Sequence, residues 1–209
     1  MPTKKIEQGE HAARVIDGKG HGPFIRIWNL AENQPLRDLR PNPLVLSPDD
    51  ELFIPDAEPG TESGETDSTH TFRRLGSTLK LRLLVRNIDG KPVANTDCEL
   101  TLGGAPIPMQ TDGDGRLEHE ITADLEDARL VVPELHLDFE LKIGHLDPVD
   151  ELPGVRARLN NLGYFAGYAT ENEAQLKWAL EEFQHENDTS LSGEVDDETK
   201  AKLLEVHGV

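Results

Sequence analysis

Apolar side chains recur at every second position in the middle of the chain. Leucine and valine alternate with lysine and arginine over residues 79–85, and similar alternation surrounds Cys98, follows Leu117 and runs through residues 135–143. Stretches rich in Asn, Asp and Gly, such as TDGDG, separate these segments and favour tight turns. Because strands with one buried face alternate in this way, the pattern predicts a small antiparallel β-sandwich of at least five strands over residues 72–146.

Beyond residue 146 the apolar spacing changes to that of α-helices. Val155, Leu159 and Leu162 would share one helix face, and Gly163 stands where a left-handed C-cap would end that helix. Asp196 is placed to cap a third helix. The two further apolar stripes are Leu176, Ala179, Leu180 and Phe183, and then Val195, Thr199, Leu203 and Val206. The pattern predicts a three-helix bundle over residues 147–209.

The charge distribution divides the chain further. The 209 residues carry a formal net charge of −19, and residues 56–71 contain five acids and no base. That segment is built from Gly, Ser, Thr and acids, so it is predicted to be an acidic linker. We therefore expect a multidomain α+β protein with an N-terminal module at 1–55, the linker at 56–71, the β-module at 72–146 and the helical module at 147–209.

Composition argues against several partners and cellular locations. The acidic surface lacks a Lys/Arg stripe, so nucleic acid is not expected as a partner. No apolar run is long enough to span a membrane and the N-terminus has no apolar signal region, so membrane association and Sec export are not expected. We expect the protein to be cytoplasmic as synthesised. The single cysteine excludes an internal disulfide.

The helical module carries a specific family resemblance. The strings VRARLNNLGYFAG, LKWALEEFQHEN and LSGEVDDETKAKL resemble the three-helix peptidoglycan-binding module found beside many cell-wall hydrolases. The Leu-Gly-Tyr ending of the first helix, the Phe-Gln of the second and the Gly-x-Val-Asp-x-x-Thr of the third fit that pattern in order. The chain departs from it between the first two helices, where GYATENEAQL replaces an Asp-Gly turn. The resemblance implies a non-catalytic module that binds the cell wall.

The N-terminal module resembles a LysM module, which implies a βααβ fold that binds N-acetylglucosamine-containing glycans between two loops. The resemblance rests on EQGEH, with Gly9-Glu10 opening the first helix, and on LVLSPDDELFIPD, with Asp49 where the family has glycine. The longer stretch IRIWNLAENQPLRDLRPNP is similar to the LysM-like variant of proteins that accompany type VI secretion spikes and related contractile injection systems. Separately, DGKPVANTDCELTLGG resembles Ig-like or transthyretin-like modules, which implies a fold for the middle module but no activity.

No residue pattern indicates catalysis. The eight histidines are scattered without HExxH or paired spacing, so no metal site is expected. Cys98 alternates in phase with buried leucines and is expected to be a packing thiol, while Asp112 and Asp114 fit a hairpin turn better than a calcium site. Adjacent acids such as Glu181 and Glu182 point apart on a helix and imply no catalytic pair. We predict no enzyme activity and no cofactor.

Binding residues are predicted in two places. Trp178 lies off the apolar stripe of its helix and is a candidate for contact with a sugar ring or a protein. The alternative is that Trp178 covers an end of the bundle or packs on another module. Trp28 is expected in the core. The predicted glycan- or partner-binding residues are Gly9, Glu10, Asn42, Pro48, Asp49, Asp50, Tyr164, Phe165 and Trp178.

Two functions remain open from the sequence. The first is a non-catalytic peptidoglycan- or glycan-binding protein that is an accessory or cargo of a type VI-like contractile injection system, which would carry it to the periplasm or outside the cell. The second is a protein–protein adaptor in which wall-binding folds dock a secretion spike or an effector protein. A further alternative, a phage lysis or tail-associated wall-binding protein, is suggested by the same modules.

Overall fold

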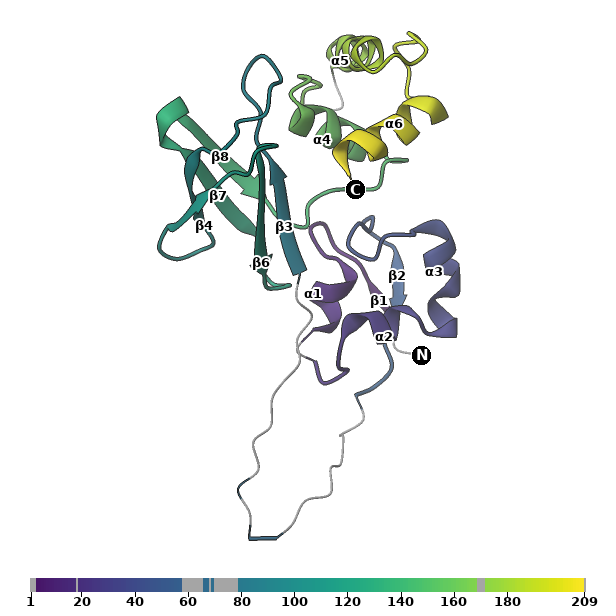
Figure 1. The fold of residues 1–209 in the computed structure, drawn as a ribbon. Coiled ribbons are helices and arrows are strands. Elements are labelled where there is room, and N and C mark those ends of the chain that lie inside the picture. The colour runs from purple at the N-terminus through teal and green to yellow at the C-terminus, as the bar shows by residue number, and fades with distance from the viewer. Residues whose placement is uncertain are drawn as a thin grey trace. The chain divides into compact units, whose positions relative to one another are not determined.

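The computed structural model describes residues 3–17, 19–57, 66–67, 69, 79–168 and 172–208 (Figure 1). It confirms a mixed α+β chain with antiparallel sheets and a C-terminal helical region. Most of the predicted linker lies outside the described residues. No helix within the described ranges has the length and apolar character needed to cross a membrane.

The chain divides into two compact units. One unit contains Met1–Lys4, Ala12–Asn33 and Phe53–Gly144, and the other contains Lys5–His11, Gln34–Leu52 and His145–Val209. The second unit therefore combines two short N-terminal segments, residues 5–11 and 34–52, with the C-terminal helices.

The N-terminal residues form short helices between two paired strands. The elements are β1 (Thr3–Lys5), α1 (Ala12–Ile16), α2 (Phe24–Trp28), the 3-10 turn η1 (Ala31–Asn33), α3 (Gln34–Leu39) and β2 (Glu51–Phe53). Trp28 is 3% exposed, which confirms its predicted core position. The prediction that Gly9 and Glu10 open the first helix is wrong, because Gly9 has a φ of 81° in a turn and α1 begins at Ala12. The LysM-like assignment stays a prediction.

The middle of the chain contains a two-stranded and a four-stranded sheet. The strands are β3 (Leu79–Leu84), β4 (Asp97–Thr101), β5 (Ile107–Gln110), β6 (Arg116–Ile121), β7 (Asp127–Val132) and β8 (Leu137–Lys142). β3 pairs with β6, and the other sheet has the order β5-β4-β7-β8, with antiparallel neighbours. Both sheets contribute to one core, formed by Val85, Val93, Cys98, Leu117, Leu130 and Val132. The burial of Cys98 at 3% exposure confirms a packing thiol.

The predicted strand beginning at Leu135 is wrong at its start. Pro133–Leu135 form a 3-10 turn, His136 follows in the left-handed region with a φ of 53°, and β8 begins only at Leu137. Proline lacks the N–H that a strand ladder needs, and the turn leaves Leu135 41% exposed.

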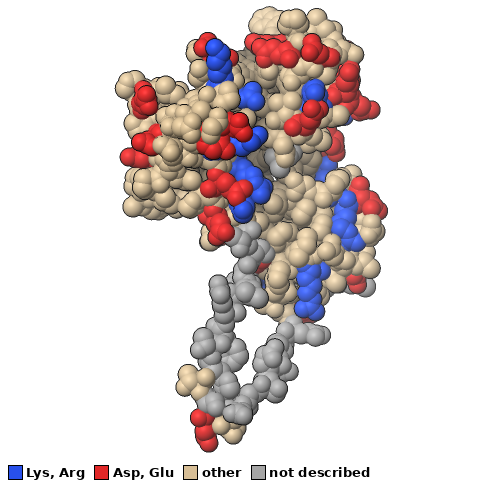
Figure 2. All heavy atoms as spheres, in the orientation of Figure 1, with Lys and Arg blue, Asp and Glu red and all other residues tan. Residues whose placement is uncertain are grey.

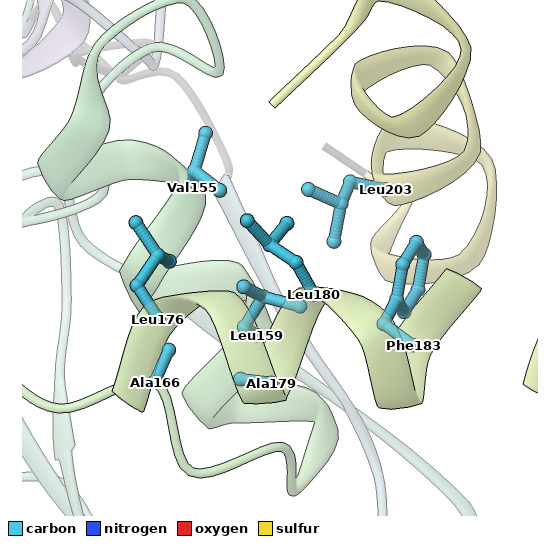
Figure 3. Close-up of a cluster of buried hydrophobic side chains, with 8 residues drawn as sticks. All are labelled: Val155, Leu159, Ala166, Leu176, Ala179, Leu180, Phe183 and Leu203. Atoms are coloured by element: carbon cyan, nitrogen blue, oxygen red, sulfur yellow. The ribbon is translucent and has the colours of Figure 1, made fainter. Parts of the chain in front are cut away.

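The C-terminal residues form three helices with a common core. These are α4 (Leu152–Leu162), α5 (Glu173–Glu186) and α6 (Asp197–His207). Figure 3 shows the core, which consists of Val155, Leu159, Ala166, Leu176, Ala179, Leu180, Phe183 and Leu203. The predicted caps are confirmed: Gly163 ends α4 with a φ of 97°, and the Asp196 carboxylate accepts a hydrogen bond from the Thr199 N–H at 2.8 Å.

Candidate functional site

Three large aromatic side chains on the C-terminal helical region face solvent. Phe165 is 67% exposed and Tyr168 is 88% exposed, both in the loop between α4 and α5, and Trp178 on α5 is 67% exposed. Exposed aromatic side chains are candidates for contact with sugar rings or with protein partners. We refer to Phe165, Tyr168 and Trp178 as the aromatic surface.

Two polar side chains of α4, the buried Arg156 and the half-buried Asn160, hold the backbone next to Phe165. The Asn160 side chain accepts a hydrogen bond from the Ala166 N–H at 2.8 Å and donates one to the Gly167 carbonyl at 3.1 Å. Arg156, which is 3% exposed, donates to the Ala166 carbonyl and, at 3.4 Å, to the Asn172 carbonyl just before α5. The backbone at Ala166 and Gly167 is therefore held from inside the module, while the neighbouring Phe165 side chain is exposed.

Tyr164 anchors the same loop rather than presenting a free ring. Its ring meets Phe183 edge-on, with ring centroids 5.4 Å apart, and its hydroxyl donates a hydrogen bond to Glu186 at 2.6 Å. Burial, and then the hydrogen bond and charge of Glu186, raise the pKa of Tyr164 to about 12. The phenol therefore stays protonated and bonded at neutral pH.

Trp178 projects from the side of α5 opposite the core. The core residues of α5 are Leu176, Ala179, Leu180 and Phe183, and at 100° per residue Trp178 points away from all of them. Glu181 and Glu182 lie one turn further along the helix on either side of Trp178, and Glu181 is 3.7 Å from the Lys177 ammonium. The indole therefore stands on a predominantly acidic helix face.

The predicted N-terminal site residues are partly used in local turns. Gly9 is buried in a left-handed turn. The Glu10 carboxylate accepts a hydrogen bond from the Glu7 N–H at 2.9 Å. The Asn42 side chain accepts one from the Leu44 N–H at 3.0 Å.

The last three predicted N-terminal residues differ in exposure. Pro48 and Asp49 are exposed, and Asp49 lies 3.6 Å from the Lys5 ammonium. The Asp50 side chain is only 8% exposed, because its carboxylate accepts hydrogen bonds from Arg40 Nε at 3.0 Å and from the Ser47 N–H at 2.8 Å. Both bonds end on Oδ2, so this one of the two carboxylate oxygens of Asp50 is already engaged within the protein.

The titratable groups of the middle sheets have structural partners. Burial raises the pKa of Cys98, in keeping with a thiol packed in the core. The Asp112 carboxylate accepts backbone hydrogen bonds from Asp114 and Arg116, both at 2.8 Å, and these lower its pKa. Within the described parts of the chain, no group of three or more His, Cys, Asp or Glu residues is placed to hold a metal ion.

Comparison with known proteins identifies the region that carries the aromatic surface. Residues 150–203 match the model of a family described as a putative peptidoglycan binding domain. The C-terminal module is similar to peptidoglycan-binding domains. This match confirms the predicted C-terminal peptidoglycan-binding module and spans α4, α5 and most of α6. No curated protein and no solved structure matches the chain.

Sequence reasoning missed four residues that shape these sites. Tyr168 adds to the aromatic surface, and its place in the unusual GYATENEAQL loop was the signal for it. Arg156 and Asn160 lie within the family-like string VRARLNN, yet their role in fixing the loop depends on contacts that no spacing reveals. Arg40 lies in the stretch IRIWNLAENQPLRDLRPNP, but its partners Asp150 and Glu151 are too far along the chain for any local pattern to indicate them.

Proposed function

We propose that this chain is a non-catalytic peptidoglycan-binding protein whose wall contact is made by the module at residues 150–203. The observation that carries the proposal is the family match over the same residues that expose Phe165, Tyr168 and Trp178. The matched family is described as a binding domain, which supports the wall-binding part of the proposal.

The aromatic surface suits a glycan physically. The C–H faces of sugar rings pack on exposed aromatic planes, which provide large contact area with few rotatable bonds. The hydrogen bonds that Arg156 donates to the Ala166 carbonyl and that Asn160 accepts from the Ala166 N–H hold this part of the backbone without a ligand. Backbone that is already held at Ala166 and Gly167 loses little conformational entropy when a ligand binds beside it, so more of the contact energy contributes to affinity.

Charge restricts which wall components can meet this surface. Residues 147–209 contain 14 acidic and 5 basic residues, a net charge of −9, and Figure 2 shows red acidic side chains gathered over the C-terminal helices. Glu181 and Glu182 flank Trp178, so anionic wall polymers would be repelled there. Uncharged sugar rings and the free amino groups of stem peptides would not be. We therefore propose the glycan strand and its amino-bearing peptides as the ligand.

Co-sedimentation with purified peptidoglycan sacculi tests the proposal. We expect saturable pelleting of the full chain, and about tenfold weaker binding for Trp178→Ala or Phe165→Ala, corresponding to about 1.4 kcal/mol for the loss of an aromatic contact. Leu84→Ala is the control, because Leu84 is an exposed apolar side chain, 45% exposed, outside the matched residues. Absence of pelleting would refute wall binding and favour the adaptor function.

We also propose that the protein works as an accessory or cargo of a contractile injection system, which would carry it from the cytoplasm to the wall. The support for this context is the resemblance of residues 1–55 to the LysM-like variant of such systems. The family match gives it no support, because the match covers only residues 150–203. The test is secretion of the chain by cells with and without a functional sheath. Sheath-dependent release supports the context, and equal release contradicts it.

A further inference from the structure

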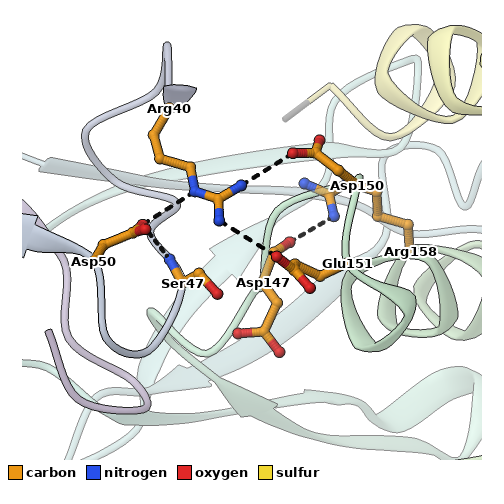
Figure 4. Close-up of polar contacts among 7 residues, drawn as sticks. All are labelled: Arg40, Ser47, Asp50, Asp147, Asp150, Glu151 and Arg158. Atoms are coloured by element: carbon orange, nitrogen blue, oxygen red, sulfur yellow. Dashed lines mark hydrogen bonds and ion pairs between the residues drawn. The ribbon is translucent and has the colours of Figure 1, made fainter. Parts of the chain in front are cut away.

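Arg40 is the centre of a charged cluster that joins distant parts of the sequence. Its side chain is 8% exposed, and Figure 4 shows its guanidinium between carboxylates on two sides. Nε donates to Asp50 at 3.0 Å, Nη1 to Asp150 at 3.0 Å and Nη2 to Glu151 at 3.3 Å. Asp150 lies 110 residues further along the chain than Arg40. Two of these three hydrogen bonds thus link the segment 34–52 to the residues just before α4, and the third stays within the segment.

The same stretch also meets the other N-terminal segment. The Gln8 side chain donates a hydrogen bond to Asp147 Oδ1 at 3.1 Å. The His145 ring lies against Gly9 so closely that a Cβ at that position would be 2.7 Å from the ring carbon Cε1. We call residues 145–151 the connector, and it contacts both segments 5–11 and 34–52.

The connector is held on its other side by α4. Arg158, which is 1% exposed, donates through Nη1 to the Asp147 carbonyl at 2.8 Å and to the Gly154 carbonyl at 2.9 Å. A Cβ at Gly154 would collide with the Pro148 carbonyl oxygen, so only glycine permits this approach. Burial lowers the pKa of Arg158 to about 10 although the charges of Asp150 and Asp147 oppose the shift. The connector therefore presents its carboxylates in a shape set by α4.

Charge complementarity explains why the connector fits the N-terminal segments. Burial alone would lower the pKa of Arg40, but the hydrogen bond and charge of Asp50, followed by Glu151 and Asp150, outweigh it and raise the pKa. If the buried guanidinium donated only to Asp50, its Nη1 and Nη2 groups would have no charged acceptor. The connector supplies a carboxylate to each of them.

We propose that the connector is an intramolecular ligand of the N-terminal loops that the sequence predicts to bind glycan. It occupies the neighbourhood of Gly9 and Asp50 and fastens segments 5–11 and 34–52 to the peptidoglycan-binding module as a closed strap. The N-terminal segments then position that module instead of offering a second, independent glycan site. Wall binding through residues 150–203 does not depend on this inference, and co-sedimentation with sacculi tests wall binding separately.

Amide hydrogen exchange of the full chain tests the strap. Asp150→Asn combined with Glu151→Gln removes two of the carboxylates and leaves the Arg40–Asp50 pair intact, so the N-terminal fold is retained. We expect amide exchange in residues 5–11, 40–52 and 145–151 to rise at least tenfold together. Arg37→Met, on α3, is the matched control and should leave these amides unchanged.

A mutant cycle gives the decisive comparison. Arg40→Met alone should accelerate amide exchange in the same three stretches. In the triple variant, which combines Arg40→Met with Asp150→Asn and Glu151→Gln, the acceleration in residues 145–151 should be smaller than the product of the two separate accelerations. The reason is that both changes break the same contacts. Unchanged exchange in residues 5–11 and 145–151, or fully multiplicative effects, would overturn the strap.

Discussion

Gln184 gives the sharpest test of how the C-terminal module is held together. Its side chain is completely buried, and its amide nitrogen lies 3.0 Å from the Ser192 hydroxyl, 3.1 Å from the Glu194 carbonyl and 2.8 Å from the Thr199 hydroxyl. Its amide oxygen accepts a hydrogen bond from the Gly193 N–H at 2.9 Å. One side chain on α5 therefore fixes both the loop before α6 and the first turn of α6.

The substitution Gln184→Met keeps the length of the side chain and removes every one of these bonds. The buried Gly193 N–H would lose its acceptor, while the buried Thr199 hydroxyl would lose the Gln184 amide but keep its hydrogen bond to Asp196. A buried donor left without a partner costs about 1–3 kcal/mol, and each of the two hydrogen bonds that the amide NH2 can donate is worth about 0.5–1.5 kcal/mol. The substitution therefore predicts a loss of about 2–6 kcal/mol in the free energy of unfolding. The less polar thioether is easier to bury and offsets a part of this, which places the expected loss near 3 kcal/mol.

Urea unfolding of the full chain, followed by far-UV circular dichroism, measures this loss. The matched control is Gln175→Met, on the same helix, where the amide is partly exposed and bonds to the exposed side chain of Asn172 at 2.8 Å. We expect the control to cost less than about 1 kcal/mol. A cost below about 1 kcal/mol for Gln184→Met as well would refute the assignment of Gln184 as the central polar contact of the module.

Three further predictions concern the same helices. Leu203→Ala should cost about 2–5 kcal/mol of unfolding free energy, measured by urea unfolding, because it empties a completely buried position. The hydrogen bond from the Thr199 N–H lowers the pKa of Asp196 below 3.8 in the folded state. The ionised Asp196 cap therefore stabilises the fold above pH 3.8, and this stabilisation is lost as the pH falls through the pKa of the folded state. Asp196→Asn should therefore show a smaller drop in melting temperature between pH 6 and pH 2.5 than the wild type does. Tyr168→Phe leaves Tyr164 as the single phenol of the chain, so the ultraviolet absorbance of Tyr164 should titrate at a pH of about 12. The free energy of unfolding should fall as the pH rises from about 10, the pKa of an unfolded tyrosine. Titration of Tyr164 near 10 would contradict its buried bond to α5.

The C-terminal module was predictable from the sequence because its determinants are local. Apolar spacing at Leu176 and Phe183 fixes the inner face of α5, and the same spacing places Trp178 outside. Gly163 and Asp196 mark helix ends through backbone requirements that act within a few residues. The buried side chains at these positions lie where periodicity placed them.

The middle sheets were predictable only in part. Alternation located β3, β4 and β6, yet β5 and β7 were not named, although Ala128, Leu130 and Val132 are buried at every second position of β7. Strand β5 spans only four residues and contains Pro108, so it gives little periodic signal.

The contacts of Arg40 could not be predicted from the chain alone. Asp150 and Glu151 lie in the acidic string HLDPVDELP, which has the composition of a boundary between modules, and a pairing across 110 residues leaves no periodic mark. A resemblance by position indicated the loops at Gly9 and Asp50, but it gave no information on which groups fill the space beside them.

The most direct test of wall binding is a nuclear magnetic resonance titration of the 15N-labelled full chain with soluble peptidoglycan fragments. The chain has two tryptophans, so the indole N–H of Trp178, 67% exposed, can be compared with that of Trp28, 3% exposed, in the same sample. The account predicts a saturable shift of the Trp178 resonance while the Trp28 resonance stays in place. An unchanged Trp178 resonance at fragment concentrations that saturate the protein, or a shift of Trp28 alone, would contradict it.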